Sequence, residues 1–93
     1  MTEYKIVHNE EKSRFEIVIN GLTSVADYIQ SGNTIVVTHT GVPKELEGQG
    51  IAAAITKTLL DYARESGFQV KPLCSYTASY IMRHTEYQDL LEK

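Results

Sequence analysis

The sequence predicts an α/β domain: a four-stranded antiparallel meander, a long crossover helix, a fifth strand parallel to the fourth, and C-terminal helices. Three observations favour this fold. Four β-type segments joined by short polar turns precede residue 41, which is typical of a meander. A glycine loop and a long amphipathic segment follow them. A connection of that length before the next β-type segment is what a parallel neighbour requires.

Size and composition indicate one globular domain over residues 1–93. The chain is 42% hydrophobic and 23% charged, and it carries a net charge of −3 without a basic run, which argues against nucleic-acid binding. No segment is long enough to cross a bilayer, and no signal peptide is evident. A lone cysteine suits a reducing compartment. We therefore expect a cytoplasmic monomer or weak dimer with no membrane partner.

Alternating apolar and polar residues predict the first strands. Phe15, Ile17 and Ile19 share one face of the second strand, and Asn20-Gly21 is a strong hairpin signal. The third segment is less regular, so a bulge or a covered second face is expected there. The fourth is rich in β-branched residues. The expected strands cover residues 4–8, 14–20, 22–30 and 34–40.

The second half of the chain predicts the crossover. A helix begins at Ile51, keeps one apolar side, and ends at Gly67. The fifth strand is expected over residues 69–74. Pro72 cannot donate a ladder hydrogen bond, so strands four and five should separate near it. A helix over 75–83 and a short last helix, introduced by a capping box at 85–88, complete the prediction.

Gly48 and Gly50 lie between the fourth strand and the long helix, which favours an anion site. Without Cβ atoms their N–H groups can converge on a phosphate, and the helix dipole adds positive potential there. A ligand-free tight turn is the alternative. The loop lacks the Lys-Ser or Lys-Thr of a nucleotide-triphosphate loop. Its spacing through Ala53 matches the dinucleotide fingerprint, but that fingerprint does not follow an antiparallel meander.

After a nucleotide triphosphate and a dinucleotide, the third candidate anion for this loop is coenzyme A. Val42-Pro43 followed by Gly48-Gln49-Gly50-Ile51-Ala52 resembles the pyrophosphate motif of GNAT-superfamily N-acetyltransferases, Gln/Arg-x-x-Gly-x-Gly/Ala, with Glu45 at the Gln/Arg position. Further segments make nearly the whole chain resemble the minimal, single-domain YjdJ-type branch of that superfamily. They are His39-Thr40, Pro72-Leu73-Cys74, Tyr80-Ile81, His84 and Glu86-Tyr87.

This resemblance implies a GNAT-like fold and transfer of an acetyl group from acetyl-CoA to a primary amine. The pantetheine arm would enter between strands four and five, with the backbone of Val42 near the pantetheine amide or the acetyl carbonyl. The pyrophosphate would lie on the backbone of Glu47, Gly48, Gln49, Gly50, Ile51 and Ala52.

The resemblance also implies roles for His39 and Cys74 near the ends of adjacent strands. His39 would take a proton from the acceptor amine, since histidine ordinarily titrates near neutrality. Cys74 would carry a transient acetyl group, or only polarise or pack against the thioester. Tyr80 is the candidate that protonates the departing thiolate, with Tyr76 as the alternative. Without the resemblance, ordinary structural roles would be favoured for both His39 and Cys74.

The acceptor side is expected to be open, because the chain has no room for the extra elements that build acceptor pockets in larger GNAT enzymes. An open site suits a protein or peptide amine, such as lysine. No His/Cys/Asp cluster has metal-ligand spacing, so no metal is expected. The competing interpretation is a non-catalytic acyl-CoA-binding or regulatory interaction module, which the Glu45 departure supports.

Overall fold

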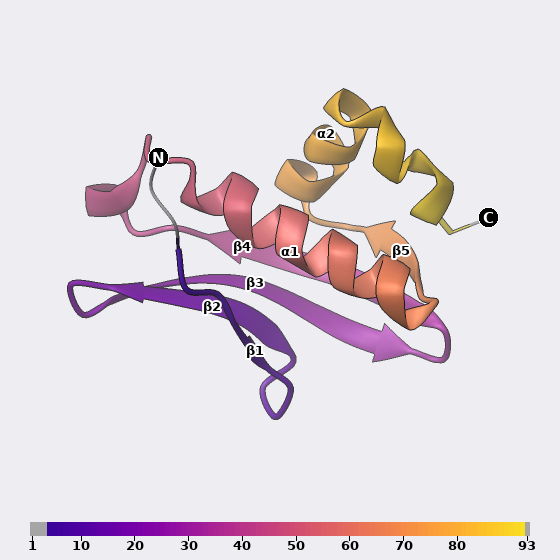
Figure 1. The fold of residues 1–93 in the computed structure, drawn as a ribbon, viewed down its shortest axis with the longest axis horizontal. Coiled ribbons are helices and arrows are strands. Elements are labelled where there is room, and N and C mark those ends of the chain that lie inside the picture. Colours follow the sequence, from indigo (N-terminus) through magenta and orange to yellow (C-terminus); the bar gives the residue numbers. More distant parts are fainter. Residues whose placement is uncertain (1–3, 93) are drawn as a thin grey trace.

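The computed structural model describes residues 4–92, which form a five-stranded mixed sheet with helices on one face (Figure 1). The strand order is β1-β2-β3-β4-β5, antiparallel except that β5 runs parallel to β4. This confirms the predicted fold class. The strands are β1 (Val7–Asn9), β2 (Arg14–Ile19), β3 (Leu22–Ser31), β4 (Thr34–Gly41) and β5 (Gln69–Pro72). The helices are α1 (Ile51–Ser66) and α2 (Ser75–Arg83), with 3₁₀ helices η1 (Lys44–Leu46) and η2 (Thr85–Leu90).

The largest differences from the prediction concern β1, β5 and the start of the last helix. β1 is shorter, because its pairing with β2 begins only at Val7, opposite Glu16. β5 ends at Pro72. The expected capping box is wrong: η2 is a 3₁₀ helix whose N-cap is His84, and no side chain caps it, because Thr85 is already its first helical residue.

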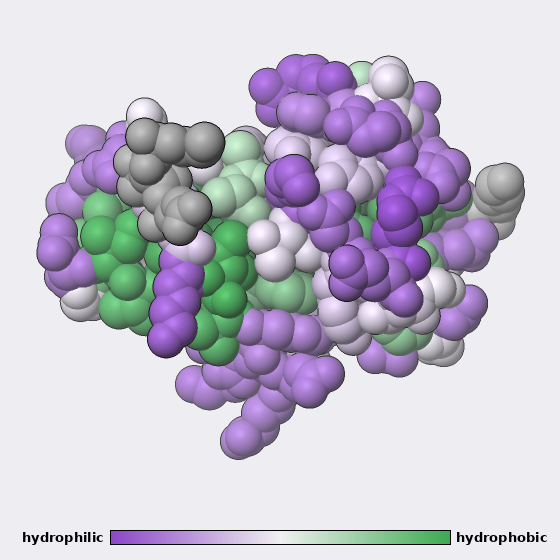
Figure 2. Space-filling view, in the orientation of Figure 1, coloured by the Kyte–Doolittle hydropathy of each residue, from purple (hydrophilic) through white to green (hydrophobic). Residues whose placement is uncertain are grey.

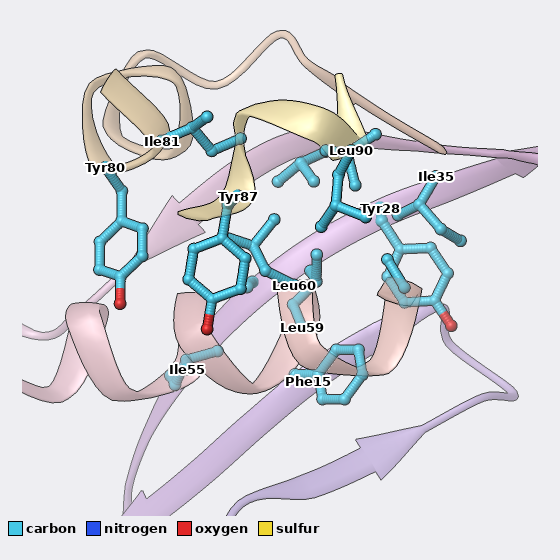
Figure 3. Packing of buried hydrophobic residues seen from close by; sticks show 14 of the residues in the cluster. Phe15, Tyr28, Ile35, Ile55, Leu59, Leu60, Tyr80, Ile81, Tyr87 and Leu90 are labelled. Carbon is cyan, nitrogen blue, oxygen red and sulfur yellow. The ribbon is translucent and has the colours of Figure 1, made fainter. Parts of the chain in front are cut away.

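The core lies between one face of the sheet and α1, as Figure 3 shows from close by. Ile55, Leu59 and Leu60 of α1 are buried against alternate residues of the strands, as the period of each element requires. Each such aliphatic side chain contributes roughly 1.5–3 kcal/mol by leaving water. The strand residues of the core are Phe15, Ile17, Ala26, Tyr28, Ile35, Val37 and Val70.

The opposite face of the sheet has no helix over it in residues 4–92. Val18 and Ile29 on that face are 62% and 59% exposed. Figure 2 shows that hydrophobic surface also gathers around the turn between β2 and β3, whereas the surface over α2 and η2 is hydrophilic. No helix in the described residues has the length and apolar character to span a membrane.

A β-bulge interrupts the pairing of β3 with β4. Tyr28 pairs with Val37 but Asp27 pairs with His39, so Thr38 is an extra residue in β4. The irregular pattern of residues 22–30 predicts a bulge or a covered second face in the third strand, whereas the inserted residue belongs to the fourth strand. Paired residues point to the same face of a sheet. The bulge therefore turns Thr40 toward the helices, opposite buried Ala26, and turns His39 toward the open face.

β4 and β5 separate at Pro72, as the sequence predicts. Their parallel pairing ends at Val37 and Pro72. The N–H groups of Leu73 and Cys74 then both donate to the Val37 carbonyl, each at 3.0 Å. Beyond this point the last residues of β4 leave β5, while the chain after β5 turns into α2. The N-terminus of α2 is thereby brought to the end of β4.

Candidate active site

A cleft of about 490 Å³ opens between the end of β4 and the N-terminus of α1. This volume is in the range of small-molecule sites. Thr40, Gly41 and Val42 form one wall, and Tyr76 of α2 contributes to the lining. The other wall consists of Leu46, Glu47, Gly48, Gly50, Ile51, Ala52 and Ala53. The glycine loop and the separated strand thus meet at one opening, as the sequence predicts.

The glycine loop presents unpaired backbone N–H groups. Gly48 and Gly50 have φ of +83° and +77°, values that L-residues with a side chain rarely adopt, and Gly50 is the uncapped N-cap of α1. The Glu47 N–H is already bonded to the Lys44 carbonyl, and Ala54 is bonded to Gly50. Within the described chain, no hydrogen bond occupies the N–H groups of residues 48–53. These groups and the helix dipole form an anion-binding surface.

Cys74 is the N-cap of α2, and its sulfur lies against Thr40 of β4. The thiol donates to the Thr40 hydroxyl at an Sγ–Oγ1 distance of 3.4 Å. Cys74 is half-buried and is not bonded to another cysteine. Thr40 lines the cleft, so this hydrogen bond places the Cys74 sulfur next to a lining residue, although Cys74 is not itself among the residues that line the cleft.

The surroundings of Cys74 favour the thiolate. Burial alone would raise the pKa of the Cys74 thiol, but hydrogen bonds from Thr40 and from the backbone N–H groups of Thr77 and Tyr76 offset this, and the pKa is lowered. The Thr77 hydroxyl is buried beside the same sulfur and also favours the charged form. It lies outside hydrogen-bond geometry and has no partner among the described residues.

His39 lies on the other face of the sheet from Cys74. It is opposite Asp27 on β3 and exposed, and Asp27 is paired with Arg14 at 3.0 Å. The His39 ring lies close to Gly41: a Cβ atom added to Gly41 would stand 2.8 Å from the His39 Nε2 atom. The structure therefore brings Cys74 together with Thr40, while His39 approaches Gly41 of the cleft from the open face.

Tyr80 and Tyr76 occupy different environments. Tyr80 is buried in the core and stacks on His84 with ring centroids 3.9 Å apart. Its hydroxyl points toward α1, beside the hydroxyl of Tyr87 (Figure 3). Burial is the largest cause that raises the pKa of Tyr80. Tyr80 is not among the residues that line the cleft, whereas Tyr76, the alternative of the sequence analysis, is.

Two contributors to this site were missed by the sequence analysis. Thr40 appeared only as a neighbour of His39, because its orientation depends on the bulge at Thr38. The alternation in residues 4–8 predicts only a strand position for Tyr4, yet its hydroxyl donates to the Gln49 carbonyl of the glycine loop at 2.6 Å. No local sequence pattern indicates a contact between segments 45 residues apart. No group of three or more His, Cys, Asp or Glu residues in the described chain could hold a metal ion.

Comparison with solved structures gives the class of protein. The NMR solution structure of a GCN5-like protein from Staphylococcus aureus matches with a TM-score of 0.76 and 28% sequence identity, covering 99% of this chain and 91% of that chain. Together with the glycine loop at the separated strands, this match identifies a GNAT-type N-acetyltransferase domain.

Sequence comparisons give the family. The family model of GCN5-related N-acetyl-transferase matches residues 14–90. Protein NATD1 from Mus musculus is 30% identical over 80 residues, which cover 83% of this chain and 73% of that protein. Protein NATD1 from Gallus gallus shows the same identity and coverage, 30% over 80 residues, 83% and 73%. The chain belongs to the GCN5-related N-acetyl-transferase family.

Proposed function

We propose that this protein transfers an acetyl group from acetyl-CoA to a primary amine. The observation that carries the proposal is the cleft itself, in which unpaired N–H groups of the glycine loop face the end of a strand that has separated from its neighbour. Such a cleft fits an elongated ligand with an anionic group at one end. Membership of the family supports acyl transfer as the reaction.

The backbone of the loop supplies the attraction for the diphosphate in this proposal. The donors are the N–H groups of Gly48, Gln49, Gly50, Ile51 and Ala52. Glu47 contributes through the start of the loop rather than through its own N–H group, which is already bonded. The pantetheine arm would follow the end of β4, with the backbone of Val42 as its polar partner.

In this proposal the nucleophile is Cys74, the general acid is Tyr76 and the general base is His39. The Cys74 thiolate attacks the thioester carbon; a C–S bond to Cys74 forms, the C–S bond to coenzyme A breaks, and Tyr76 gives its hydroxyl proton to the departing thiolate. The acceptor amine then attacks the acetylated Cys74, and Cys74 leaves as a thiolate. Because His39 lies on the other face of the sheet, the amine proton passes through solvent to His39 beside Gly41. Solvent returns the proton from His39 to Tyr76.

The acceptor in this proposal is a lysine of a protein or peptide. Support comes from the open face of the sheet, which no described helix covers and on which His39 lies. A lysine on a protein surface can reach such a face, whereas a small metabolite would need an enclosing wall. The proposal treats the protein as a monomer or weak dimer.

The proposal is tested by calorimetric titration with acetyl-CoA, followed by intact mass spectrometry of the mixture. We expect micromolar binding and an added acetyl group that is absent from Cys74→Ala. Binding with no adduct in a protein that still acetylates a lysine peptide would replace the covalent route by direct transfer. No binding would overturn the proposal.

A second candidate, a non-catalytic acyl-CoA-binding module, is favoured by one observation. Glu47 lines the cleft, and no Lys or Arg is among the lining residues. A carboxylate beside the diphosphate and the absence of a cation both weaken the binding of an anion. This candidate predicts binding with no turnover on any amine, and equal acetyl-CoA affinity in the wild type, Cys74→Ala and His39→Ala.

A further inference from the structure

The glycine loop is held at its centre by one side chain from the N-terminal segment. The Tyr4 hydroxyl donates to the Gln49 carbonyl at 2.6 Å, and Gln49 lies between the two glycines with positive φ. The flanking tethers are the Glu47–Lys44 and Ala54–Gly50 backbone bonds. Between these two tethers, the Tyr4 bond is the only hydrogen bond to the loop within residues 4–92.

The loop needs such a tether because its glycines make no side-chain contacts. A Cβ built at Gly48 or at Gly50 would meet nothing within 4 Å. Glycine also has the largest choice of backbone conformations, so its ordering costs more entropy than that of any other residue. No side chain caps the helix at Gly50. Packing therefore does little to fix the orientation of the peptide planes in this loop.

Fixing the Gln49 carbonyl also fixes the direction of the next N–H group. The Gln49 carbonyl and the Gly50 N–H belong to one planar trans peptide, so they point in opposite directions. Tyr4 holds the carbonyl and is not among the residues that line the cleft, whereas Gly50 is. The bond thus holds the Gln49 carbonyl on a residue outside the cleft lining, while the opposite side of the same peptide carries the N–H group of the lining residue Gly50.

We propose that Tyr4 is a positioning residue for the cofactor, which presets the Gln49–Gly50 peptide so that the Gly50 N–H can bind the diphosphate. This inference rests on the proposed function, since it presumes that acetyl-CoA binds in this cleft. Because the cleft has no cation in its lining, correctly oriented peptide N–H groups carry most of the attraction for the anion. Losing the tether should reduce affinity without changing the reacting groups.

The test compares Tyr4→Phe with a matched control, Tyr62→Phe. Both substitutions remove one tyrosine hydroxyl and keep the ring. Tyr62 lies on α1 and packs by its ring on His8 and Phe15, and its hydroxyl makes no hydrogen bond within residues 4–92. Each variant is titrated with acetyl-CoA and, by NMR, with S-acetylpantetheine, which has the thioester arm but no diphosphate. Steady-state kinetics supply KM and kcat.

We expect Tyr4→Phe to bind acetyl-CoA about 3- to 10-fold more weakly, the effect of one hydrogen bond. KM should rise by the same factor with kcat unchanged, while S-acetylpantetheine affinity and all Tyr62→Phe values stay at the wild-type level. Wild-type affinity in Tyr4→Phe, or equal weakening for both ligands, would overturn this inference alone. If the wild type itself bound no acetyl-CoA, the proposed function would fall first, and the inference with it.

Discussion

The hydrogen bond between Cys74 and Thr40 joins the two separated strands of the sheet at the site. Thr40 belongs to β4, and Cys74 follows β5. The protonated Cys74 thiol donates to the Thr40 hydroxyl. When Cys74 is a thiolate, the Thr40 hydroxyl can rotate and donate to the sulfur instead. Hydrogen bonding to the charged form lowers the pKa of a thiol. Thr40 is therefore the side chain that links the shape of the cleft to the reactivity of Cys74.

Replacing Thr40 by valine tests this link. Thr40→Val keeps the volume and removes the hydroxyl, so the pKa of Cys74 should rise and its thiolate fraction at pH 7 should fall. The measurement is the rate of Cys74 alkylation by iodoacetamide as a function of pH. Thr58→Val, which loses a hydroxyl bonded only to Ala54 within α1, is the control. Identical alkylation profiles for Thr40→Val and wild type would rule out this role.

Substitution of Tyr76 and of Tyr80, both on α2, distinguishes which of them is the proton donor. Tyr76→Phe should reduce kcat by about 10²-fold, because Tyr76 lines the cleft and general acid catalysis typically contributes that much or more. Tyr80→Phe should change kcat by less than threefold, since Tyr80 is not among the residues that line the cleft. Thermal unfolding of both variants is the control for folding. A larger loss of kcat in Tyr80→Phe than in Tyr76→Phe would reverse the assignment.

At the residue scale, the sequence could predict which residues are near the site but not which way they point. His39 and Thr40 alternate along β4, so an inserted Thr38 exchanges their faces. The β-branched run of residues 34–40 predicts a strand with or without that insertion. Tyr76 and Tyr80 lie one helical turn apart, and only the packing of α2 decides which of them reaches the cleft.

At the element scale, the glycine loop and the start of α1 form one functional unit. Gly50→Ala should weaken acetyl-CoA binding about tenfold, because an L-residue at φ of +77° is strained by roughly 1–2 kcal/mol and the relaxed loop would rotate its N–H groups. Calorimetric titration gives the affinity. The prediction concerns the direction of the donors, not the volume of the cleft, because the position has open space around it.

Gly32→Ala is the strain-matched control for this prediction. Gly32 also has positive φ, +58°, and open space around it, but it lies in the turn between β3 and β4. Both variants should lose a similar amount of stability in urea unfolding, and only Gly50→Ala should lose affinity. Equal affinities in the two variants would show that the conformation at Gly50 is irrelevant to binding.

The elements themselves were largely predictable, for local physical reasons. Asn20 and Gly21 both have positive φ, as the expected type I′ hairpin requires. Gly67 ends α1 in the left-handed conformation, with its N–H bonded to Ala63 and Arg64. The last helix could not be predicted in detail, because its 3₁₀ form depends on packing: Tyr87 is buried, and its hydroxyl donates to Asp61 of α1 at 2.6 Å.

At the scale of the whole molecule, an aromatic cluster connects the N-terminal strand to the core. The His8 ring stacks on Phe15 of β2 with centroids 4.1 Å apart and meets Tyr62 of α1 edge-on. Its Nε2 atom shares a 2.6 Å hydrogen bond with the Tyr28 hydroxyl of β3. β1 pairs with one neighbour only, so this cluster is its main connection to the other side of the core. No partner of His8 can be identified from the sequence alone.

Burial makes this cluster sensitive to pH. It lowers the pKa of His8 below the ordinary value of 6.5, and the carboxylate of Glu10 only partly opposes it. The unfolded chain therefore binds this proton more tightly than the folded one. Stability from His8 is fully present above pH 6.5 and is lost as the pH falls through the folded-state pKa. The free energy of unfolding of the wild type should accordingly decrease between pH 7 and pH 5.5.

His8→Gln separates this effect from the other titrations of the molecule. Glutamine can still bond to the Tyr28 hydroxyl but cannot take up a proton, so the variant should be less stable at pH 7, through the lost ring stacking on Phe15, yet should lack most of the decrease toward pH 5.5. Urea unfolding at several pH values gives both quantities. An unchanged slope with pH would assign the acid sensitivity to other groups, and the aromatic cluster would then stabilise β1 by packing alone.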